Sequence, residues 1–142
     1  FGEFKLITYK DVISNSIHLA FVKGEIDSND DVMVRVHEPL TILDFIVKDD
    51  KHSWTPNEAF EKISNEKNGV MLFLNYGASA NLKKIGDLDQ QPKNKENDLR
   101  NYGIGSQILV DLGVKNMKLL ASPRKMPSMM GFGLEVKEFI EK

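Results

Sequence analysis

The chain has 142 residues, of which 28% are charged and 41% hydrophobic, with a formal net charge of −2 and no cysteine. The lack of cysteine excludes disulfides and thiolate metal sites, and the even spread of charge argues against nucleic acid as a partner. No apolar run is long enough to span a membrane, so we expect a cytoplasmic protein without membrane contact. The length favours one domain over residues 1–142, and the start at Phe1 instead of Met suggests a piece of a longer polypeptide.

The first third of the chain predicts three short strands. They are expected at residues 4–9, 17–22 and 32–37, where β-branched and aromatic residues predominate. Polar turns at 14–16 and 29–31 separate them. This spacing is typical of a meander, in which consecutive strands lie side by side.

A capped helix is predicted after an apolar segment at 41–47 and a polar loop at 48–52. Thr55 fits the N-cap, Pro56 the first helical position, and Glu58 completes a capping box.

This helix is expected to end near Asn68, with Gly69 as its stop signal. The apolar run at 70–74 predicts a strand that is buried on both faces. Residues 89–97 contain no apolar side chain and predict a mobile surface loop.

A second helix is predicted after that loop, with Asp98 as its N-cap and Gly113 as its end. Its apolar face comprises Ile104, Ile108, Leu109 and Leu112. Strands follow at 116–120 and 134–140. The methionines between these strands are interpreted as core residues; they are Met126, Met129 and Met130.

The segment from Tyr102 to Val114 closely resembles the block YGIGAQIL.DLGV of GTP cyclohydrolase II. Further stretches match that family in order and spacing, at residues 2–9, 18–25, 34–38, 117–120 and 131–136. The resemblance implies an α+β fold with a mixed or antiparallel sheet and packed helices.

In that family, three cysteines hold a zinc ion that activates a water for attack on the guanine ring of GTP, and formate is released. The corresponding positions here are Pro39, Asp50 and His52, none of which is a thiol. A replacement site that also uses His37 and Glu38 is chemically conceivable. A solvated charged loop is the favoured interpretation, so we expect no metal cofactor.

Other parts of the family pattern are also missing. The place of its acid- and arginine-containing loop reads Asn75 to Leu82, without an acid or an arginine. The helix that carries a substrate-contacting tyrosine has no counterpart, and a family threonine is replaced by Ala121.

Some functional positions are retained. Asp98 and Arg100 match the family's Asp-x-Arg, whose residues the resemblance assigns as general acid/base and as nucleophile on the α-phosphorus. Arg35, Glu38 and Lys125 match positions near the substrate. A structural role for Asp98 as a helix cap, or for Arg100 as its ion-pair partner, explains these two residues equally well.

The family domain is often fused behind 3,4-dihydroxy-2-butanone 4-phosphate synthase in riboflavin biosynthesis. We therefore predict the C-terminal part of such a bifunctional fusion: a degenerate cyclohydrolase domain with a structural or regulatory role for an N-terminal synthase domain in the same polypeptide. The resemblance also implies a homodimer, on which the sequence itself gives no information. Two alternatives remain: a residual GTP cyclohydrolase II or nucleotide pyrophosphohydrolase with a replacement metal site, and a regulatory module that binds GTP or another nucleotide.

Overall fold

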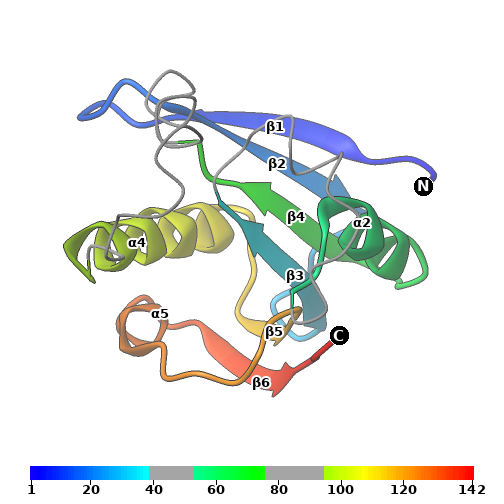
Figure 1. Cartoon of the computed structure of the whole chain (residues 1–142). Coiled ribbons are helices and arrows are strands. Elements are labelled where there is room, and N and C mark those ends of the chain that lie inside the picture. The colour runs from blue at the N-terminus through cyan, green and yellow to red at the C-terminus, as the bar shows by residue number, and fades with distance from the viewer. Residues whose placement is uncertain (39–52, 76–94) are drawn as a thin grey trace.

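The computed structural model describes residues 1–38, 53–75 and 95–142, without the side chains of residues 95–102, 127 and 128. Six strands and three helices are present in this part of the chain (Figure 1). In chain order they are β1 (Lys5–Lys10), β2 (Ile17–Lys23), β3 (Asp31–His37), α2 (Pro56–Ser64), β4 (Gly69–Phe73), α4 (Lys95–Asp111), β5 (Asn116–Leu119), α5 (Pro127–Gly131) and β6 (Glu135–Phe139).

The strands form one mixed sheet in the order β1-β2-β4-β3-β5-β6. The β1/β2 and β2/β4 pairs are antiparallel, and the remaining three pairs are parallel. This confirms the predicted α+β fold with a mixed sheet. The predicted meander is wrong, because β4 lies between β2 and β3, pairing Leu72 with Ala20 on one side and with Val36 on the other.

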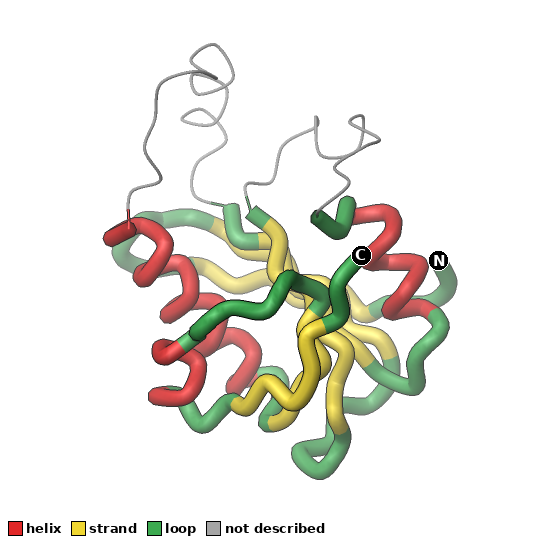
Figure 2. Tube along the Cα trace, turned by 60° about the horizontal axis from the view of Figure 1, so that its bottom comes forward, coloured by secondary structure: helices red, strands yellow, loops and turns green. Residues whose placement is uncertain are grey.

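Helices cover both faces of this sheet, with α4 and α5 on one face and α2 on the other (Figure 2). Successive β4 side chains alternate between the two layers. Val70 and Leu72 pack in the core beneath α4, whereas Met71 and Phe73 pack beneath α2. All five residues of β4 are buried, which confirms the prediction from its continuous apolar run.

Helix α2 begins as predicted but ends sooner. The Thr55 side chain accepts from the Glu58 backbone N–H, and the Glu58 carboxylate accepts from the Thr55 N–H at 3.0 Å. The helix ends at Ser64, and Gly69 opens β4 instead of stopping the helix. A Cβ at Gly69 would lie 2.6 Å from Ile63 Cγ2, so this glycine lets β4 approach α2 closely.

Helix α4 begins at Lys95, so Asp98 lies inside it and the predicted N-cap is wrong. The predicted loop at 89–97 is therefore helical from residue 95, and its earlier part lies outside the described residues. The predicted stop is confirmed, because Gly113 has a left-handed φ of 89° and Val114 donates back to the Leu109 carbonyl at 3.0 Å.

The two C-terminal strands are confirmed, while the short helix α5 between them was not predicted. Met129 is buried and Met126 is partly buried against the same core. Met130 is 77% exposed, so its predicted core position is wrong. Met130 directly follows Met129 on the helix, and adjacent helical residues point in different directions, so the two side chains do not face the same core.

The predicted apolar segment at 41–47 and polar loop at 48–52 lie outside the described residues. Within the described part of the chain, no helix is long and apolar enough to cross a membrane. A single domain over residues 1–142 stays a prediction.

Candidate functional site

The carboxyl ends of β4, β3 and β5 lie next to one another at one edge of the sheet, because these three strands are parallel neighbours. Ligand sites in sheets of this kind commonly lie at that edge. Of the residues that sequence reasoning selected, Arg35 lies in the second half of β3 and Glu38 directly follows that strand, whereas Lys125 comes six residues after the end of β5.

Arg35 is buried and joins separate parts of the backbone. One guanidinium nitrogen, Nη1, donates to the Leu120 carbonyl at 2.8 Å, and Nη2 donates to the Trp54 carbonyl at 2.9 Å. Nη2 also donates to Ser53 Oγ at 3.2 Å. These bonds hold two segments against β3: the residue that follows β5 and the residues that lead into α2. They give Arg35 a structural role, and its predicted contact with substrate stays untested.

His37 and Glu38 follow at the end of β3. The His37 ring packs edge-on against Phe73, with ring centroids 5.6 Å apart and the planes at 71°. Glu38 is exposed. His37 is thus packed against the aromatic residues of the α2 face.

His18 lies at the start of β2 and is 1% exposed. Its Nδ1 accepts the backbone N–H of Asn75 at 3.0 Å, which joins β2 to the chain leaving β4. Burial lowers the pKa of His18 and favours the neutral ring that can accept this bond.

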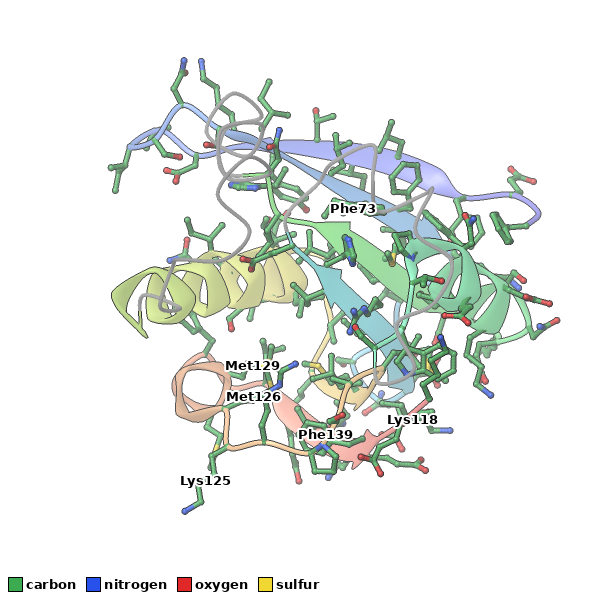
Figure 3. The ribbon with its side chains drawn as sticks, in the orientation of Figure 1. Phe73, Lys118, Lys125, Met126, Met129 and Phe139 are labelled. Atoms are coloured by element: carbon green, nitrogen blue, oxygen red, sulfur yellow. The ribbon has the colours of Figure 1, made fainter. Side chains whose placement is uncertain are left out.

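Lys125 lies on the outside of the molecule, with its side chain directed away from the sheet (Figure 3). Asp98 and Arg100 lie in the first half of α4, and their side chains belong to the part that is not described. The described structure therefore does not bring the predicted catalytic pair together with Lys125, and these roles stay predictions.

The former cysteine positions Pro39, Asp50 and His52 all lie outside the described residues. Among the residues that are described, no group of three His, Asp or Glu side chains could hold a metal ion. The whole sequence lacks cysteine, so its donor set does not fit the thiolate zinc site of the family. No reaction step is derived through zinc for this chain.

Sequence reasoning missed a contact between β1 and α4. The Tyr9 hydroxyl donates to Asp111 Oδ2 at 2.6 Å across 102 positions of sequence. Desolvation, followed by the hydrogen bond and the charge of Asp111, raises the pKa of Tyr9 well above its ordinary value. The phenol thus remains a donor at neutral pH. No local pattern could have revealed this pair, because the two residues meet only through the fold.

Residues 1–141 match the family model described as GTP cyclohydrolase II. The chain belongs to this family. A protein of Neisseria meningitidis serogroup A named 3,4-dihydroxy-2-butanone 4-phosphate synthase is 38% identical over 99% of the chain and 39% of its own length. A Photobacterium phosphoreum protein of the same name is 40% identical over 99% of the chain and 40% of its own length. The riboflavin biosynthesis protein RibBA of Bacillus subtilis is 36% identical over 97% of the chain and 39% of its own length. The chain thus spans about two fifths of these relatives.

These matches contradict three linked predictions. The degenerate domain with only a supporting role is not upheld, because relatives that align with nearly the whole chain are themselves named as the synthase. The assignment to the C-terminal part of a bifunctional fusion is also wrong, since those relatives carry the synthase name alone. A separate N-terminal synthase domain as the partner is corrected for the same reason. The missing cysteines argue only against the zinc-dependent reaction. They do not exclude a different reaction.

Proposed function

We propose that the protein acts in riboflavin biosynthesis, in the cytoplasm, and that the protein as a whole is a 3,4-dihydroxy-2-butanone 4-phosphate synthase. The observation that supports this is the name shared by five relatives that are 33–40% identical over at least 98% of the chain. The riboflavin pathway is supported independently by the relatives named RibBA.

The activity is proposed for the whole protein, because the chain spans about 39% of the length of the synthases it matches. Within the described residues, the geometry supports a framework role for the sheet edge at β3 and β5. Arg35 donates hydrogen bonds there to the Leu120 and Trp54 carbonyls. These bonds hold the ends of β3 and β5 next to the segment that leads into α2.

A genetic complementation experiment tests the proposal. The complete gene product is expressed in a bacterial strain that lacks its own 3,4-dihydroxy-2-butanone 4-phosphate synthase and needs added riboflavin. We expect growth without riboflavin, together with 3,4-dihydroxy-2-butanone 4-phosphate in cell extracts measured by mass spectrometry. An empty vector is the negative control, and the strain's own synthase gene is the positive one. Absence of growth at normal expression levels contradicts the proposal.

Metal content tests the separate expectation that no zinc is bound. Purified protein grown with added zinc should contain far less than one equivalent, because no thiolate is present to hold the ion. One bound equivalent that disappears in both Asp50→Ala and His52→Ala contradicts this expectation and identifies a replacement site.

Binding of GTP and formation of a homodimer stay predictions. A shift of the melting temperature on addition of GTP tests the first, and analytical sedimentation tests the second.

A further inference from the structure

A groove runs between the β1–β2 hairpin loop and α4. Its volume is about 610 Å³, which lies in the range of pockets that take small molecules. Val12 and Ile13 line it on the hairpin side, and Ile104 and Ile108 line it on the helix side. We name it the hairpin groove.

The hairpin wall of the groove is held in place by its own hydrogen bonds. The Asp11 N–H donates to the Ser16 carbonyl at 2.9 Å, which closes the loop. The Asp11 carboxylate accepts from the Ile13 N–H at 2.9 Å and from the Ser14 hydroxyl at 2.7 Å. Although the loop is fixed in this way, Val12 and Ile13 are 89% and 83% exposed. A preformed loop therefore presents two aliphatic side chains to solvent beside the groove.

The helix wall contains a glycine that packing against the described residues does not require. Among the described residues, no atom lies within 4 Å of a Cβ built on Gly103. By contrast, a Cβ at Gly105, two residues on, would be in van der Waals contact with the core, 3.4 Å from Leu74 Cδ1. Glycine inside a helix lowers stability relative to alanine. The space at Gly103 thus lies in the groove, where another molecule can approach the helix closely.

The charge of the groove favours a cation. Among the residues that the structure describes, the charged ones that line it are Lys10, Asp11 and Asp111, which give a formal net charge of −1. His18 also lines the groove, and burial lowers its pKa, so it adds no positive charge at neutral pH. Asp111 is oriented by the Tyr9 hydroxyl at 2.6 Å. A phosphate or carboxylate ligand would meet net repulsion here.

We infer that the hairpin groove binds a small organic cation, an amine or amidine with a flat or aliphatic body. The positive group lies at the Asp111 carboxylate, and the apolar body lies between Ile13 and the open helix surface at Gly103. Neither Arg35, Glu38 nor Lys125 lines the groove, so the inference is independent of the predicted substrate residues and of the proposed synthase activity.

Benzamidine is the probe for the test, and benzoate, with the same ring and the opposite charge, is its matched control. Each is titrated into ¹⁵N-labelled protein and followed by amide chemical shifts. We expect saturable shifts with benzamidine at the amides of Ile13, Gly103 and Gln107, and none with benzoate. Equal responses to the two compounds, or benzamidine shifts confined to other residues, overturn the inference.

Two variants sharpen this test. Gly103→Leu adds a side chain on the groove wall, where its Cβ meets no described atom within 4 Å, so benzamidine affinity should fall about tenfold or more. Gly131→Leu is the matched control, because a Cβ there also has nothing within 4 Å and Gly131 does not line the groove. Asp111→Asn keeps an acceptor for Tyr9 but removes the charge, so affinity should fall about fivefold. Wild-type affinity in both Gly103→Leu and Asp111→Asn overturns the inference.

Discussion

The two faces of the sheet fill their space in different ways. Beneath α2, a small core depends on aromatic rings: Phe60 packs edge-on against Phe4 and Phe21 at 5.4 and 5.3 Å, and lies 6.1 Å from Phe73. Beneath α4, a larger and mainly aliphatic core leaves the hairpin groove open at its margin. The α2 face is thus filled by a few large aromatic rings. The α4 face is filled by many smaller side chains, and the hairpin groove lies beside them.

The largest effect is expected from removing one ring of the α2 face. Phe73→Ala should lower the free energy of unfolding by about 3–5 kcal/mol, because it leaves a cavity in a small core. Urea denaturation followed by circular dichroism measures this change. Val110→Ala on α4 is the control, because Val110 is 44% exposed and its loss should change stability by about 0.5 kcal/mol or less. Similar losses in the two variants would show that Phe73 is not essential to its face.

Alanine at two glycines should change stability in opposite directions. Gly69→Ala forces a Cβ to within 2.9 Å of the Met33 carbonyl oxygen, and we expect a loss of about 1–3 kcal/mol. Gly103→Ala adds a Cβ in open space within a helix, and we expect a gain of about 0.5–1 kcal/mol. Both are read from denaturant midpoints. A loss at Gly103 would mean that the α4 face is packed as tightly as the α2 face.

The capping box of α2 should make a smaller contribution. Thr55→Ala removes the side chain that accepts from the Glu58 N–H, and we expect a loss of about 1 kcal/mol. Thr55→Ser retains the hydroxyl and serves as the control. If the serine and alanine variants melt at the same temperature, the cap does not stabilise this helix.

The smallest effect concerns the pH dependence at the groove. Desolvation and Asp111 raise the Tyr9 pKa above its ordinary value of 10.0, so the fold favours the protonated phenol. This contribution is complete below pH 10 and is lost as the pH rises from there towards the higher folded-state pKa. In an absorbance titration of the three tyrosines, one should ionise late, and Tyr9→Phe should remove that late component. If all three ionise together near pH 10 in the folded protein, Tyr9 is not shielded as described.

The sequence located the strands well, because their signals are local. The wholly apolar run at 70–74 could only be accommodated by a strand covered on both faces, and it became β4. The order of the strands could not be predicted, since nothing in residues 17–37 shows that β4 will separate β2 from β3. The prediction of Asp98 as an N-cap was also wrong, because α4 begins three residues earlier, at Lys95.

The candidate sites were harder to predict because their parts are distant in sequence. Arg35 was selected as a substrate residue, but its bond to Leu120, 85 positions away, was invisible from the sequence. The absence of cysteine speaks against a thiolate zinc site, and the expectation of no metal cofactor stays a prediction. The step from that absence to a degenerate domain with only a supporting role was wrong, because the absence of one reaction's ligands carries no information about another reaction.

The central place of β4 also affects how the protein folds during synthesis. β2 and β3 leave the ribosome first, separated by a short turn, and β4 follows only after α2. The β1/β2 pair can form as soon as both strands have emerged, whereas β3 has to wait for β4, its neighbour in the sheet, which follows it only after α2. Completion of the sheet therefore depends on contacts between residues distant in sequence, and such contacts are slow to form.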